Sequence, residues 1–132
     1  MNVIMSIKPK WADKILSGEK TVEFRKTVFK KDVDKVYIYS SSPVKKIVGY
    51  FCPKISVHVD DPGIIFKCFQ KYGCITEKEF YEYFGNNSTA YAILIKNALK
   101  FNNPIDPYKS IENFRAPQSF MYIDCDIDGK IK

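Results

Sequence analysis

The sequence predicts a mixed α+β fold built around a small, closed or nearly closed β-sheet. The chain has 132 residues, a length that suits a single domain over residues 1–132. Hydrophobic residues make up 45% and charged residues 27%, as is usual for a globular protein. The predicted order of elements is strand, helix, several strands, two helices and further strands. This order differs from the regular alternation of a doubly wound sheet and favours a curled mixed sheet.

The first elements are predicted to be a strand, a helix and a second strand. Residues 3–7 are short and apolar enough for the first strand. Pro9 suits the first position of a helix and Gly18 the position just after its end. After this helix, Val22 and Phe24 alternate with polar neighbours, which predicts a strand with one buried face and one polar face.

Strands are also predicted in the middle of the chain, over residues 36–39 and 47–51. Pro53 interrupts the second of these, and residues 55–59 are expected to continue the sheet. Gly49 lies inside a strand, which often marks a bulge or the close approach of another backbone.

Two helices are predicted next. Asp61 and Pro62 are typical of an N-cap and a first helical position, and Thr76 with Glu79 forms a capping box for the second helix. The buried stripes are expected to consist of Ile64, Ile65, Cys68, Phe69 and Tyr72 in the first helix, and of Phe80, Tyr83 and Phe84 in the second. The remaining predicted elements are a strand over 91–99, a turn-rich loop over 102–107, one helical turn over 110–114 and a last strand over 120–125.

Positive charge is concentrated at the start of the chain. There are 21 Lys and Arg against 15 Asp and Glu, and residues 1–54 contain 12 of the basic residues but only 5 of the acidic ones. Such asymmetry is typical of a surface that binds a polyanion such as nucleic acid, although a solvated lysine-rich surface would give the same count. Only Arg25 and Arg115 are arginine, which indicates a need there for a planar, forked cation.

Several kinds of chemistry are disfavoured. The sequence has no glycine-rich phosphate loop and no HExxH motif, and its one histidine, His58, falls in a predicted strand. The four cysteines contain no CxxC pair, so we expect reduced thiols, no metal and no cofactor. No apolar run approaches the roughly 20 residues that cross a bilayer, and residues 1–10 lack the apolar core of a signal peptide. We therefore expect a cytoplasmic protein with no membrane partner.

One cluster of polar side chains is suited to binding or catalysis. It consists of Lys20, Thr21, Glu23 and Arg25, with Lys8 brought near by the helix before them. Lys20 and Arg25 could hold phosphates or another anionic substrate, and Glu23 could accept a hydrogen bond from an amine of a base. Lys20 could instead act as a general base oriented by Glu23. The cluster could also be a plain ladder of surface salt bridges.

Five stretches of the sequence carry a resemblance to known proteins. They are Ser6-Ile7-Lys8-Pro9, then Gly18-x-Lys20-x-x-Glu23-x-Arg25, then Val36-Tyr37-Ile38-Tyr39-Ser40-Ser41 followed by Ile47-Val48-Gly49-Tyr50, and finally Ala116-Pro117-Gln118-Ser119-Phe120-Met121-Tyr122. Together they resemble the ASCH domain family of the PUA-like superfamily over nearly the whole chain, apart from residues 56–88. The resemblance implies a small PUA-like mixed β-barrel with helices packed at its openings.

The resemblance also implies an RNA-binding module whose basic cleft is lined by the GxKxxExR strand. The nucleic-acid-binding residues would be Lys8, Lys20, Thr21, Glu23, Arg25, Ser40 and Ser41. Some small members of the family hydrolyse N4-acetylcytidine, and ribonuclease activity is associated with some relatives. An enzyme of either kind would use Lys20 and Glu23 as catalytic residues. The amidohydrolases have a threonine at the position that Glu23 occupies here.

Three functional hypotheses therefore stand side by side. In the main one, the chain binds RNA or a modified nucleotide: Lys20 and Arg25 hold a phosphate or a base edge, and Glu23 reads an amine. Tyr39 or Phe120 would then provide the stacking platform for a base. The alternative is a small nucleoside or RNA hydrolase. The third is a protein-interaction role, as in family members that form parts of transcription coactivators. The sequence does not predict the oligomeric state.

Overall fold

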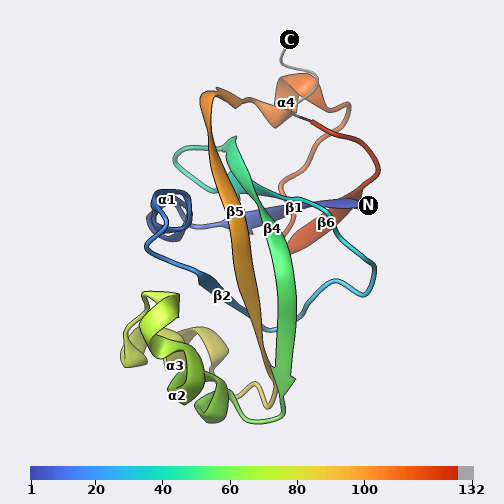
Figure 1. The fold of residues 1–132 in the computed structure, drawn as a ribbon. Coiled ribbons are helices and arrows are strands. Elements are labelled where there is room, and N and C mark those ends of the chain that lie inside the picture. Colours follow the sequence, from blue (N-terminus) through green and yellow to red (C-terminus); the bar gives the residue numbers. More distant parts are fainter. Residues whose placement is uncertain (128–132) are drawn as a thin grey trace.

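The computed structural model describes residues 1–127, which form a six-stranded mixed sheet curled strongly into a half-barrel (Figure 1). The strands are β1 (Asn2–Ile7), β2 (Val22–Arg25), β3 (Val36–Ser40), β4 (Lys46–Val59), β5 (Ala90–Ile105) and β6 (Phe120–Ile123). The helices in this part of the chain are α1 (Pro9–Ser17), α2 (Pro62–Gly73), α3 (Glu77–Phe84) and α4 (Pro107–Ser110). The predicted α+β class with a small curled mixed sheet is confirmed.

The strand order is β2-β5-β4-β3-β1-β6, so β2 and β6 are the two edges of the half-barrel. In Figure 1, the long β4–β5 pair runs along the molecule, with α2 and α3 near one end and α4 near the other. β1 and β3 are parallel, and Ile7 at the end of β1 lies opposite Ser40 at the end of β3. The segments that leave these strands, starting at Lys8 and Ser41, therefore begin on the same side of the sheet.

Both faces of the central strands are buried. Val3 and Met5 of β1 belong to a core cluster that packs against α1. Ile4 of β1 and Tyr37 of β3 belong to a second cluster on the other face, toward α4. Because alternate residues of a strand point to opposite faces, one apolar run supplies both clusters.

The local signals for helix ends and close packing are confirmed. Gly18 ends α1 with a φ of 88°, in the left-handed region that favours glycine. Asp61 caps α2 by accepting a hydrogen bond from the amide of Gly63 at 2.9 Å. A Cβ at position 49 would collide with the backbone carbonyl of Leu99, so Gly49 does mark the close approach of another backbone.

The buried face of α2 differs from the predicted stripe. Ile65 and Phe66 are buried, whereas Ile64 and Tyr72 are 49% and 50% exposed and Cys68 is exposed. The helix is rotated by about one residue because Gly73 must face the ring of Phe24, against which no Cβ would fit. The sequence pattern is ambiguous here, since apolar residues lie on both candidate faces. In α3, Phe80 and Phe84 are buried as predicted, but Tyr83 is 37% exposed.

Residues 46–110 differ from the prediction in three further places. β4 is one continuous strand whose register shifts between Pro53 and Ile55, rather than two strands. β5 continues to Ile105, through residues predicted to be a loop, because Ile105 pairs with Ile47 of β4. The helical turn lies at Pro107–Ser110 rather than 110–114, capped by the side chain of Asp106. No helix in residues 1–127 is both long enough and apolar enough to span a membrane.

Lys10 of α1 forms an ion pair with Glu79, the carboxylate of the α3 capping box. We expect this pair to make the stability of the protein sensitive to acid. Hydrogen bonds from Lys10 and from the backbone of Thr76 lower the pKa of Glu79 from 4.5 to about 2. A carboxylate with a depressed pKa in the folded state stabilises the protein above its ordinary pKa. That contribution is lost as the pH falls from 4.5 through about 2. The free energy of unfolding of Glu79→Gln should therefore depend less on pH in this range than that of the wild type.

Urea unfolding at neutral pH and near pH 3 measures this difference. Glu77→Gln, in the same turn of α3, is the control because Glu77 has no ion-pair partner among the described residues. The same acid sensitivity in the Glu79→Gln protein and the wild type would contradict the assignment.

Candidate functional site

β2 has two chemically different faces, as its alternating sequence predicts. Val22 and Phe24 pack against α2 and α3 in an apolar cluster. Glu23 and Arg25 project from the other face and are also buried. The polar face of this strand is therefore part of the interior and not of an open convex surface.

Lys20, Glu23 and Arg25 form a buried chain of ion pairs. Lys20 Nζ lies 3.4 Å from Glu23 Oε1, and Arg25 Nη1 lies 3.2 Å from Glu23 Oε2. The three side chains are 2%, 7% and 10% exposed in that order. The predicted row of salt bridges therefore exists, but it is buried and not on the surface. In it, the single carboxylate of Glu23 compensates the charges of two cations.

Arg25 also connects the two edges of the half-barrel. From the edge strand β2, its guanidinium donates to the carbonyl of Ser6 in β1 at 3.3 Å and to Ser119 Oγ, just before β6, at 2.9 Å. The carbonyl of Ser119 accepts a further bond at 3.4 Å. These contacts use the planar fork of arginine, in agreement with the expectation for this position.

Burial and the Glu23 carboxylate act on the pKa of Lys20 in opposite directions. Burial lowers the pKa of Lys20, and the nearby Glu23 carboxylate opposes this shift. Lys20 Nζ donates to the carbonyl of Gly73 at 2.6 Å and lies 5.4 Å from the ring centroids of both Trp11 and Phe24. The amine is thus held between two aromatic rings, one acid and one carbonyl.

A cleft of about 910 Å³ is lined by all three ion-paired residues. Of the residues predicted to bind nucleic acid, those that line it are Lys8, Lys20, Glu23, Arg25 and Ser41. The structure does not bring Thr21 and Ser40 to the cleft. Thr21 precedes β2 and is exposed, so the alternation of the strand does not extend to it. Ser40 is buried at the end of β3.

The cleft contains further polar and aromatic residues that sequence reasoning did not assign as binding residues. They include Trp11, Lys26, Lys45, Glu82, Tyr83, Tyr108 and Ser119. Ser119 belongs to a segment that matches the family pattern, so a signal for it was present in the sequence. Tyr39, named as a stacking candidate, lines the cleft. The other candidate, Phe120, is absent from its lining and packs edge-on against Phe29.

Two tyrosines of the cleft share a hydrogen bond. The hydroxyl oxygens of Tyr39 and Tyr108 are 3.0 Å apart. Burial and this hydrogen bond raise the pKa of Tyr39 to about 12. Tyr39 therefore keeps its proton at neutral pH, and its hydroxyl can form a hydrogen bond with a ligand in the cleft.

Comparison with known proteins identifies related chains. The ASCH domain model matches residues 5–104. The chain is 30% identical to part of ATP synthase subunit alpha and 32% identical to part of large ribosomal subunit protein uL22, both from Ureaplasma parvum. Each match covers 92% of this chain but only 15% and 39% of those proteins. It is also 28% identical to an ASCH domain-containing ribonuclease from Zymomonas mobilis, over 91% of this chain and 82% of that protein.

Solved structures show the same fold. The crystal structure of ASCH from Zymomonas mobilis superposes with a TM-score of 0.88 at 25% identity, covering 98% of this chain and 92% of that one. Two variants of that protein, one with a serine changed to alanine and one with a tyrosine changed to phenylalanine, give TM-scores of 0.88 and 0.89.

Proposed function

The chain belongs to the ASCH domain family, and from that premise we propose that it binds single-stranded RNA in the cleft and cleaves it. The observation that carries the proposal is the composition of the cleft. Lys8, Lys26 and Lys45, which have no acidic partner in the described residues, line the cleft together with Tyr39, Ser119 and the buried ion-pair chain. The Zymomonas relative named as a ribonuclease supports the same activity.

The cleft has the groups that single-stranded RNA needs. Lys8 and Lys45 line it, and neither has an ion-pair partner within residues 1–127. Their ammonium groups would hold backbone phosphates. Trp11 and Tyr83 would stack against unpaired bases, since stacking on aromatic side chains is how single-stranded RNA is commonly held.

The same cleft can support cleavage. In the proposed reaction, the ribose 2′-oxygen attacks the adjacent phosphorus and the bond to the 5′-oxygen breaks, which leaves a 2′,3′-cyclic phosphate and a 5′-hydroxyl. Lys20, whose pKa is lowered by burial, takes the proton from the 2′-hydroxyl, with Glu23 orienting its amine. Tyr39 gives its proton to the leaving oxygen. Lys8 and Lys45 stabilise the charge that develops on the phosphate.

A second candidate is hydrolysis of N4-acetylcytidine, which the Lys20–Glu23 pair favours. A buried amine with a lowered pKa beside a carboxylate can accept a proton from water. The water oxygen would bond to the acetyl carbonyl carbon, and the bond to N4 would break to release acetate and cytidine. Incubation with N4-acetylcytidine and detection of cytidine tests this candidate separately from RNA cleavage.

Salt dependence of binding tests the main proposal. We expect the affinity for single-stranded RNA to fall steeply as salt increases. The slope in question is that of the logarithm of the binding constant against the logarithm of the salt concentration. Lys8→Ala and Lys45→Ala should each make this slope shallower by about 0.7, the value for one phosphate contact with a single strand. Lys100→Ala is the control, because Lys100 is exposed on β5 and does not line the cleft. Equal slopes for all four proteins would contradict binding in the cleft.

A further inference from the structure

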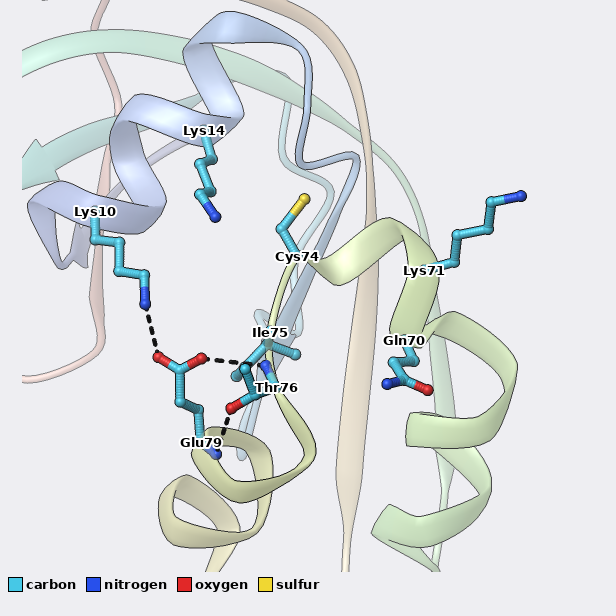
Figure 2. Close-up of a pocket in the computed structure, with 8 residues that line it drawn as sticks. All are labelled: Lys10, Lys14, Gln70, Lys71, Cys74, Ile75, Thr76 and Glu79. Atoms are coloured by element: carbon cyan, nitrogen blue, oxygen red, sulfur yellow. Dashed lines mark hydrogen bonds and ion pairs between the residues drawn. The ribbon is translucent and has the colours of Figure 1, made fainter.

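A second cavity lies beside the cleft, between α1 and the α2–α3 pair. This outer pocket has a volume of about 480 Å³. Its wall contains Lys10 and Lys14 of α1, Gln70 and Lys71 of α2, residues 74–76, and Glu79 of α3 (Figure 2). In Figure 2, Lys14 extends from α1 toward the pocket, while Lys71 extends outward from its rim.

The outer pocket has an excess of positive charge. Glu79, its one carboxylate, is already engaged by Lys10 Nζ at 2.9 Å and by the backbone amide of Thr76 at 3.1 Å. Within the described residues, Lys14 and Lys71 have no acidic partner at ion-pair distance. Two ammonium groups are therefore left to attract an anion, and the one negative group is compensated.

The outer pocket adjoins the cleft. Ile75 and Glu79 line both cavities. Trp11 lines the cleft, and its ring is approached by lysines of both cavities. Lys10 Nζ and Lys14 Nζ, from the outer pocket, lie 4.6 and 5.7 Å from its centroid, and Lys20 Nζ of the cleft lies 5.4 Å away. The indole and the Lys10–Glu79 pair thus stand between the two cavities.

We propose that the outer pocket binds a second backbone phosphate of the same RNA strand whose reacting phosphate lies in the cleft. The strand would cross the Lys10–Glu79 pair with a base stacked near Trp11. Lys14 would hold this second phosphate in the outer pocket, and Lys71, which extends outward from the rim, would hold the phosphate after it. This inference rests on the proposed function and narrows its substrate to RNA strands with several phosphates, because a ligand with one phosphate cannot reach from the cleft into the outer pocket.

The experiment compares two RNA lengths. One probe is a fluorescein-labelled dodecamer of 2′-O-methyluridine, which cannot be cleaved through its 2′-oxygen, and the other is the matching dinucleoside monophosphate with a single phosphate. Dodecamer affinity is measured by fluorescence anisotropy and dinucleotide affinity by NMR titration. The test variant is Lys14→Ala/Lys71→Ala. The charge-matched control is Lys54→Ala/Lys100→Ala, whose exposed lysines line neither cavity.

The double variant of the outer pocket should bind the dodecamer roughly tenfold more weakly than the wild type at low salt. Its log–log salt slope should be shallower by about 1.4, which corresponds to two lost phosphate contacts. Its dinucleotide affinity should stay within about twofold of the wild type, and the control should bind both probes like the wild type.

Three outcomes overturn the inference, and they differ in what they say about the proposed function. An unchanged dodecamer affinity in the double variant, with normal dinucleotide binding, overturns the outer-pocket subsite alone. Equal losses for both probes also overturn it, because the lysines would then act on the cleft. If the wild type binds neither RNA at low salt, RNA binding in the cleft is itself wrong, and the subsite falls with it.

Discussion

Glu23→Gln is expected to lower the free energy of unfolding by about 3–5 kcal/mol, because it leaves buried cations without their counter-charge. Glu23 lies within 3.4 Å of Lys20 and 3.2 Å of Arg25, and all three side chains are at most 10% exposed. A neutral amide cannot compensate either cation, and burial limits their solvation by water. Urea unfolding followed by circular dichroism measures the change.

The matched control is Glu82→Gln. Glu82 forms an ion pair with Lys78 at 3.9 Å, but these side chains are 66% and 87% exposed. Solvent-exposed pairs contribute little, so this variant should differ from the wild type by about 0.5 kcal/mol or less. If Glu23→Gln were as mild as Glu82→Gln, Glu23 would not compensate two buried cations.

Tyr39→Phe is expected to reduce the rate of RNA cleavage by about 100-fold or more, the usual loss when a general acid is removed. The substitution keeps the ring, which packs against Tyr108 and Phe114 with centroids 6.4 and 5.6 Å away. Only the hydroxyl and its 3.0 Å hydrogen bond to Tyr108 are lost. The fold should therefore survive with a loss of about 1 kcal/mol.

Single-turnover cleavage of a labelled RNA measures this effect, since it separates chemistry from product release. Tyr72→Phe is the control, because Tyr72 is half exposed on α2 and lines neither cavity. RNA binding by Tyr39→Phe should remain close to that of the wild type. Cleavage at the wild-type rate would remove Tyr39 from the mechanism.

The sequence predicted those features that depend on neighbouring residues. Pro9 and Gly18 bound the first helix, and Thr76 with Glu79 caps α3, because each signal acts within one helical turn. The alternation around Val22 likewise placed Glu23 and Arg25 on one face of β2. Alternation stops at the end of a strand, which is why it misplaced Thr21.

The parts of the site that depend on distant pairing could not be predicted from local patterns. Ser119 reaches Arg25 only because the sheet curls until β2 lies near the segment before β6. Lys45 follows β3, and it enters the cleft because β1 and β3 run parallel and end together. The face of α2 was misjudged for a similar reason, since contact with Phe24 selects between two apolar stripes.

The most direct test of RNA binding in the cleft is a crystal structure with a non-cleavable dinucleotide, in which a 2′-fluoro group replaces the attacking 2′-hydroxyl. We predict that its phosphate lies within hydrogen-bond distance of the Lys8 and Lys45 ammonium groups, beside the Tyr39 hydroxyl, with a base against Trp11. A dinucleotide bound outside the cleft, or an empty cleft at saturating ligand concentration, would contradict it.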